Sequence, residues 1–153
     1  MSTVRTFVLF LVLLLVGTLT AVAQSNEIID SILDQQPATV ASAAYLALSA
    51  ADLVPDDASP QRAYETAVQS GWLDADVAAD SAATFGQAAH LLMQAFEVPG
   101  GLMYRIFTGP RYAAREFEYQ QWVPERHSPR EQISGEFLIR MAGSFLDNRE
   151  VTQ

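Results

Sequence analysis

Arginine and aromatic side chains gather in one stretch of this chain, on both sides of the Gly109-Pro110 break. The cluster consists of Arg105, Arg111, Arg115, Tyr104 and Tyr112. Arg111 and Arg115 are four residues apart, so on a helix they would share a face. Guanidinium groups beside aromatic rings suit a carboxylate or a sugar acid. The sequence therefore predicts a ligand-binding site here. The alternative is structural: these arginines form ion pairs with the acidic residues of segment 52–80.

Other chemistries are poorly represented. The chain has no cysteine and two histidines, His90 and His127, neither with a neighbour at zinc-ligand spacing. We expect His90 on a helix flank and His127 in a solvated loop. Asp74, Asp76 and Asp80 share one loop, which we interpret as solvated rather than as a calcium site. The sequence contains no nucleophile elbow or phosphate-binding loop, so we expect no catalytic residue, no metal and no cofactor.

One enzymatic alternative stays open, because two carboxylates in a cleft can cleave a glycosidic bond. Candidates by residue type alone are Glu116, Glu118, Glu125, Glu131 and Glu136. Nothing in the sequence marks a deep cleft that would hold two of them. We therefore expect a non-enzymatic protein, with a small glycan-acting hydrolase as the alternative.

The charge is acidic and unevenly distributed. The chain has 18 acidic residues and nine arginines, without lysine, for a net charge of −9. Residues 26–97 hold eleven acids and one arginine, whereas residues 98–153 hold seven of each. An acidic surface repels phosphate backbones and anionic membranes. We expect no nucleic-acid partner and no binding to anionic membrane surfaces.

Residues 1–23 have the layout of a secretory signal peptide. Arg5 precedes an apolar run at 7–16, and Ala21-Val22-Ala23 places cleavage before Gln24. The alternative is an uncleaved membrane anchor. With cleavage, we expect an exported protein that is not inserted in a membrane and that resides in the periplasm, at the cell surface or outside the cell.

The remaining residues, about 130 of them, predict one all-α domain, because they are rich in alanine and lack alternating strand patterns. We expect a short helix in the N-terminal segment 24–37, a helical domain over 38–146 and a polar tail over 147–153. Capping residues predict helix starts at Thr39, Ser59-Pro60, Thr84 with Gln87, Pro110 and Ser134. The apolar run 102–107 is long enough for one or two buried turns, so we expect it mainly to pack.

A faint internal repeat connects these helices. Ala38–Leu48 lies over Ala83–Met93 at an offset of 45, and Trp72-Leu73 lies over Trp122-Val123 at an offset of 50. A unit consists of a helix, a Trp with an aliphatic residue, a loop of about ten residues and a capped helix. The repeat-motif positions are Thr39, Thr84, Gln87, Glu136, Trp72 and Trp122.

These residues resemble the S-layer homology (SLH) domain. That family repeats a helical hairpin whose second helix opens with Thr-Arg-Ala-Glu, and three units pack as a pseudo-threefold bundle with cell-wall polymer in the grooves between them. Thr39 and Thr84 match the first motif position and Glu136 the last, while the polymer-contacting arginine is absent from all three copies. The resemblance implies a small bundle of about three SLH-like helical-hairpin units, and it implies the architecture more than the ligand.

Together these patterns favour an exported, non-enzymatic binding or structural module of the cell envelope. Its expected partner is a cell-wall polymer or an envelope protein. Besides the hydrolase, a protein-interaction domain with no glycan role remains an alternative, because exposed Tyr and Trp serve that use equally well.

Overall fold

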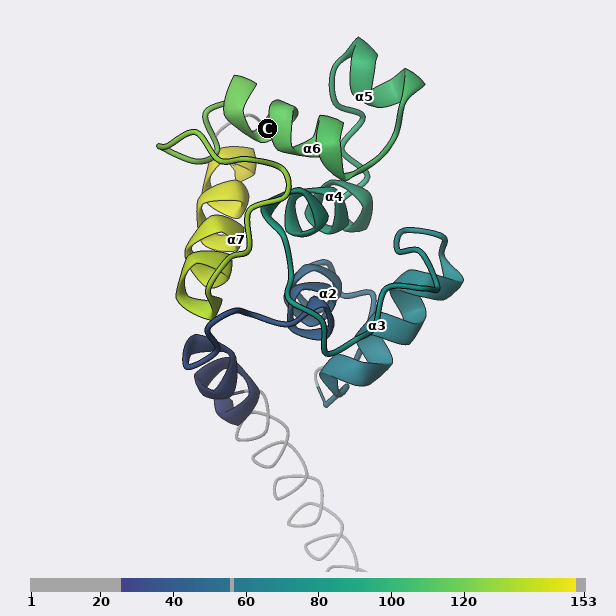
Figure 1. Ribbon diagram of the computed structural model, residues 1–153, viewed down its shortest axis with the longest axis vertical. Coiled ribbons are helices and arrows are strands. Elements are labelled where there is room, and N and C mark those ends of the chain that lie inside the picture. Colours follow the sequence, from purple (N-terminus) through teal and green to yellow (C-terminus); the bar gives the residue numbers. More distant parts are fainter. Residues whose placement is uncertain (1–25, 56, 151–153) are drawn as a thin grey trace, which may run out of the picture.

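The computed structural model describes residues 26–55 and 57–150, which fold into helices joined by turns (Figure 1). After a helical segment at 26–33, the helices are α2 (Val40–Ala50), α3 (Pro60–Gln69), α4 (Phe85–Ala95), α5 (Leu102–Ile106), α6 (Pro110–Tyr119) and α7 (Gly135–Glu150). Extended pairing in these ranges is limited to two isolated bridges, Thr39–Ala82 and Thr84–Gln132. The all-α prediction is confirmed. The expected signal peptide, residues 1–23, lies outside the described residues.

The predicted helix starts are confirmed by their caps. The Thr39, Ser59 and Thr84 side chains each accept a hydrogen bond from the amide three residues later, which satisfies a donor that has no partner inside the helix. Gln87 completes the capping box of α4. The Ser134 hydroxyl accepts from the amide of Phe137 at 3.2 Å, at the start of α7.

Three residues that precede these capping residues form a closed ring of backbone hydrogen bonds. The amide of Ala38 donates to the carbonyl of Ile133 (2.8 Å), Ile133 donates to Ala83 (3.1 Å), and Ala83 donates to Ala38 (2.8 Å). All three residues are at least 96 % buried. We call this arrangement the three-way ring. It joins the starts of α2, α4 and α7, although 45 and 50 residues separate its members along the chain.

The first amide of each of these helices also finds a partner in another segment. Val40 donates to Ser81 (2.9 Å), Phe85 to Glu131 (2.8 Å) and Gly135 to Gln35 (2.9 Å). Such amides are unpaired within a helix and costly to bury alone. Each of these first helical amides therefore obtains its hydrogen-bond acceptor from a segment that is distant in the sequence.

The core surrounds the ring. Figure 1 shows α2 and α4 at the centre, α3 beside α2, α6 beside α4, and α7 along one flank. The largest fully buried side chains include Tyr45, Phe85, Leu91, Phe117 and Phe145. The described core is drawn from residues 28–146. Trp72 and Trp122 pack against it and are partly buried.

Two expectations differ from the structure. The run 102–107 does not mainly pack: Tyr104 is buried, but Leu102, Met103, Ile106 and Phe107 are 55–68 % exposed. The second concerns bounds: α7 continues from the expected helical domain into the polar segment 147–150, where Arg149 contacts the end of α4. The Arg149 guanidinium lies 4.8 Å from the centre of the Phe96 ring and donates to the Phe96 carbonyl at 3.0 Å.

Within the described ranges, no helix has the length and apolarity needed to span a bilayer.

Gly135 provides a test of the ring. A Cβ added there would collide with the carbonyl of Ile32, so we expect Gly135→Ala to lower the free energy of unfolding by about 3 kcal/mol. Gly143→Ala is the matched control, since the same helix leaves open space there, and it should stabilise by about 0.5–1 kcal/mol. Urea denaturation measures both. A Gly135→Ala protein as stable as wild type would contradict this packing.

Candidate functional site

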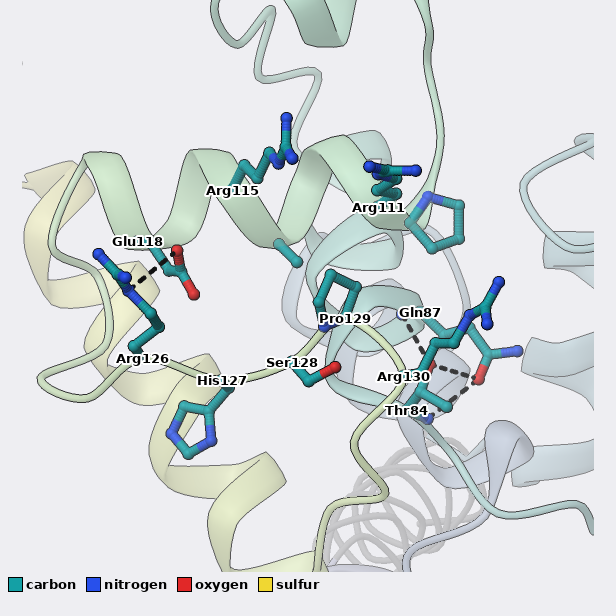
Figure 2. A pocket seen from close by; sticks show the side chains of 12 residues that line it. Thr84, Gln87, Arg111, Arg115, Glu118, Arg126, His127, Ser128, Pro129 and Arg130 are labelled. Carbon is teal, nitrogen blue, oxygen red and sulfur yellow. Dashed lines mark hydrogen bonds and ion pairs between the residues drawn. The ribbon is translucent and has the colours of Figure 1, made fainter.

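A surface groove of about 1090 Å³ lies between α6, the start of α4 and the loop at 124–132 (Figure 2). Four arginines line it, two from α6 and two from the loop: Arg111, Arg115, Arg126 and Arg130. We call it the arginine groove. The other lining residues are Thr84, Gln87, Pro110, Ala114, Glu118, His127, Ser128 and Pro129.

Gly86 brings the three segments of the groove together. Its amide donates to the carbonyl of Pro129 at 3.0 Å. A Cβ at this position would lie 2.8 Å from the carbonyl oxygens of both Pro110 and Pro129, closer than carbon and oxygen can approach without displacing backbone. Because residue 86 is glycine, the loop at 124–132 and the start of α6 can both approach α4 closely. Each of these two segments then forms one wall of the groove.

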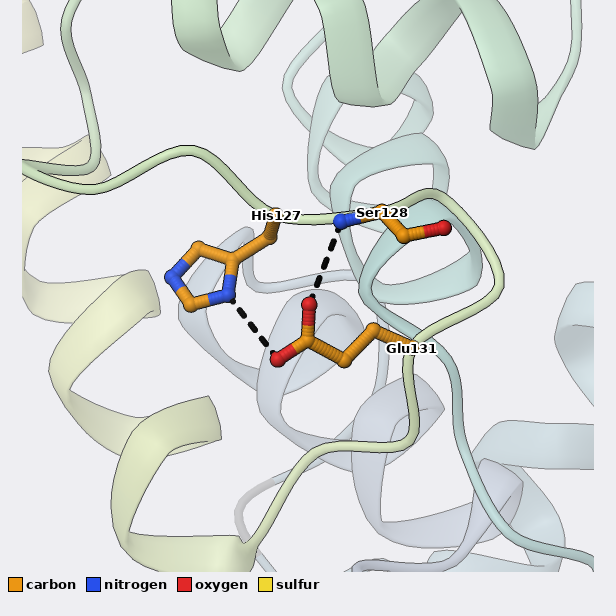
Figure 3. A network of polar contacts seen from close by, with 3 residues as sticks. All are labelled: His127, Ser128 and Glu131. Carbon is orange, nitrogen blue, oxygen red and sulfur yellow. Dashed lines mark hydrogen bonds and ion pairs between the residues drawn. The ribbon is translucent and has the colours of Figure 1, made fainter.

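A polar contact fixes the loop that carries Arg126 and Arg130 (Figure 3). One carboxylate oxygen of Glu131 lies 3.2 Å from Nδ1 of His127, and the other accepts from the Ser128 amide at 3.1 Å. The His127 ring lies 5.2 Å from that of Phe85 and 4.6 Å from that of Phe137, between ring centres. Its side chain is 13 % exposed, so the expectation of a solvated loop histidine is wrong. The packing holds the turn between the two arginines.

The groove is positively charged on an acidic protein. Among the described lining residues, Glu118 is the one carboxylate against four guanidinium groups. It lies 3.9 Å from Nε of Arg126, whose side chain is 90 % exposed, and such a pair contributes little. Within residues 26–55 and 57–150, Arg111, Arg115 and Arg130 have no ion pair. Arg115 does lie 5.7 Å over the ring of Tyr112.

The predicted binding cluster is divided by the structure. Arg111 and Arg115 line the arginine groove, as Figure 2 shows, whereas Arg105 is exposed on α5. Tyr104 is buried, and Tyr112 stacks on Phe107 with 5.6 Å between ring centres. The structural alternative is not seen either, because none of the three arginines pairs with an acid of segment 52–80 in the described ranges.

Sequence reasoning missed Arg126 and Arg130. Both lie in the charged loop that follows Trp122, and the repeat places this loop where the second unit has its acidic loop at 74–83. The exchange of acids for arginines at equivalent places was a usable signal. The motif residue Glu136 does not line the arginine groove. It is exposed on the surface of α7, where its carboxylate lies 3.4 Å from the Arg140 guanidinium.

The chemistry that this groove can perform is binding of anions. Guanidinium groups donate two parallel hydrogen bonds to carboxylates and phosphates, and four of them spaced around one groove suit a ligand with several charges. Cleavage of a glycosidic bond needs two carboxylates, and the described lining residues include one, Glu118. The described residues also contain no group of three or more His, Cys, Asp or Glu able to hold a metal ion.

A second polar network lies away from the groove, in the core. His90 is 6 % exposed, so it is not on an open helix flank. Its Nδ1 lies 2.9 Å from the Tyr104 hydroxyl, which accepts from Nε2 of Gln94 at 2.8 Å. The hydroxyl has one proton to donate, and a neutral His90 with its hydrogen on Nε2 offers Nδ1 as the acceptor for it. Burial lowers the pKa of His90 to about 4, against a smaller opposing effect of Asp74.

This pKa predicts acid sensitivity. Between pH 6.5 and about 4, the unfolded chain binds a proton at residue 90 that the folded protein does not bind. The free energy of unfolding therefore falls as pH falls through this window, by up to about 3 kcal/mol. His90→Gln keeps an acceptor for Tyr104 but removes the titration. The stability difference between wild type and His90→Gln should narrow from pH 7 to pH 4 in denaturation curves. A difference independent of pH would contradict the assignment.

Comparison with known proteins gives no match: no family model, no curated protein and no solved structure is similar to this chain. The likeness to the SLH repeat therefore rests on the residues quoted above. Function has to be argued from the arginine groove and from the surface of the molecule.

Proposed function

We propose that this chain is an exported, non-enzymatic binding module of the cell envelope, and that its arginine groove holds an anionic polymer. The observation that carries the proposal is the set of three guanidinium groups, on Arg111, Arg115 and Arg130, without an ion pair in the described ranges. Cations that no carboxylate neutralises, gathered in one groove, match a ligand with repeated carboxylate or phosphate groups.

We also propose that the fold consists of three SLH-like hairpin units. The three-way ring supports this, since Ala38, Ala83 and Ile133 make equivalent bonds at intervals close to the sequence repeat. The ends of α3 and α6 give further support. Trp72 donates to Ala67 at 2.9 Å and Trp122 to Phe117 at 3.0 Å, and the preceding residues, Gly71 and Gln121, both have positive φ.

In this arrangement the arginine groove lies between the second and third units. Its walls are α4 of one unit and α6 with the following loop of the next. The Thr-Arg-Ala-Glu arginine is missing from the start of α4, where Phe85 is buried instead. The four groove arginines are carried by other positions, so the charge needed for an anionic ligand is supplied by the neighbouring unit.

A pair of polymers that differ only in charge tests the proposal. We expect the protein to bind carboxymethyl-dextran and not unmodified dextran in isothermal titration calorimetry, with affinity that falls as salt rises. Arg111→Ala combined with Arg130→Ala should weaken binding by about tenfold or more, since each charge-assisted bond contributes on the order of 1 kcal/mol or more.

Arg62→Ala combined with Arg140→Ala is the matched control, because it removes two exposed positive charges from α3 and α7, outside the groove. It should change the affinity less than twofold, as measured at equal salt. An equal loss in both double variants would mean general attraction to positive charge and would contradict a site. Equal affinity for dextran and carboxymethyl-dextran would also contradict an anion-binding site.

A further inference from the structure

The surface of α5 carries a concentration of apolar side chains that the proposed function does not use. Leu102, Met103, Ile106 and Phe107 are 68, 55, 58 and 56 % exposed. Their spacing places them on one face of the short helix. We call these four side chains the α5 tip. Large apolar groups gathered on a surface mark interaction sites more often than single exposed ones do.

The α5 tip is held in place by buried polar contacts at its base. The Tyr104 hydroxyl bonds to His90 and Gln94 of α4. The amide of Gly101 donates to Oε2 of Glu116 at 2.9 Å, and Glu116 is 8 % exposed. Phe107, at the edge of the tip, stacks on Tyr112 of α6 and is still 56 % exposed. The buried Tyr104 thus attaches α5 to α4, and Glu116 attaches its start to α6, while Leu102, Met103 and Ile106 are turned outward.

The charged side chain that α5 itself carries is positive. Residues 98–115 contain no acidic residue, although Glu97 and Glu116 flank them, in a chain of net charge −9. Arg105 is exposed on α5 itself, and within the described ranges it has no ion pair. Figure 1 shows α5 beyond α6, on the opposite side of α4 from α3, and far from the helical segment at 26–33. The segment 26–33 and α3 are therefore away from the tip. Asp74 is nearer, since its charge acts on the pKa of His90 beneath α5, and the carboxylate of Glu116 is turned inward to the Gly101 amide.

We propose that the α5 tip inserts shallowly into a lipid bilayer with anionic headgroups. Apolar side chains of interfacial helices enter the boundary between headgroups and acyl chains, to a depth of roughly 5–10 Å, and a five-residue helix is about 7.5 Å long. Arg105 beside the apolar face would contact lipid phosphates. The acidity of the rest of the chain opposes binding only weakly at this distance, because physiological salt screens charges within about 8 Å.

A second copy of this chain fits the tip less well. Two-fold contacts place the same patch on both partners, so tip-to-tip pairing would bring Arg105 toward its own copy with no acidic residue in 98–115 to balance it. An anionic bilayer balances the same charge and accepts all four apolar side chains. Charge complementarity therefore favours the lipid surface.

Single-cysteine labelling tests the proposal, because the natural chain has no cysteine. The protein used begins at Gln24, so that residues 1–23 do not contribute, and its cooperative thermal transition is verified first. Met103→Cys carries a polarity-sensitive fluorophore, and Gln69→Cys, exposed at the end of α3, is the control. With phosphatidylcholine–phosphatidylglycerol vesicles we expect a blue shift at residue 103 and none at residue 69. The shift should be smaller with phosphatidylcholine alone.

A matched pair of substitutions gives the affinity. Ile106→Glu should weaken vesicle binding by about tenfold and leave the melting temperature unchanged, since the side chain is already exposed. Leu53→Glu makes the same change at an exposed residue far from the tip and should leave the affinity unchanged. Carboxymethyl-dextran binding should be unaffected by Ile106→Glu, which separates this proposal from the groove.

Three results would overturn the proposal. The first is no blue shift at residue 103 with anionic vesicles. The second is an equal shift at residues 103 and 69, which would mean non-specific adsorption. The third is a shift at residue 103 without lipid that grows with protein concentration, which would identify the tip as a contact between copies.

Discussion

The rest of this structure depends on the three-way ring of hydrogen bonds among Ala38, Ala83 and Ile133. An isolated helix leaves its first amides unpaired, and here the first helical amides, of Val40, Phe85 and Gly135, receive carbonyls from segments 41 or more residues away. No helix start in the ring is complete until the other two are in place. The ring is also tightly enclosed, because Gly86 and Gly135, just after the ring residues, have no room for a Cβ. Local capping thus selects where each helix begins, and the ring fixes how the three beginnings meet.

The functional surfaces follow from that geometry. The ring holds the start of α4 against the loop at 124–132, and the close approach at Gly86 adds the start of α6, so that arginines of two segments face one groove. The α5 helix is an excursion between α4 and α6, attached by Glu116 and by the Tyr104–His90 contact. The two surfaces have different chemistry. The groove presents four guanidinium groups on a lining that also includes apolar atoms of Pro110, Ala114 and Pro129, and the α5 tip presents apolar side chains with arginine beside them.

Helix class and helix starts could be predicted from the sequence because they depend on local rules: Thr39, Ser59 and Thr84 cap the helices that follow them. The positions of side chains that depend on distant contacts could not. The run 102–107 has the composition of buried helix, yet two polar contacts from α4 and α6 hold most of it outward. His127 is buried by rings from α4 and α7. Arg126 and Arg130 line the groove only because the backbone segments approach one another closely at Gly86. The spacing of residues in the sequence does not predict that approach.

Amide hydrogen exchange measured by NMR tests the role of the three-way ring most directly. If the ring holds the fold together, the amides of Ala38, Ala83 and Ile133 open only when the whole protein unfolds. Their exchange free energies should then agree with one another and with the global free energy of unfolding to within about 1 kcal/mol. Exchange of any one of the three through a local opening, several kcal/mol below the global value, would contradict the account, because that helix start could then separate while the others stayed joined.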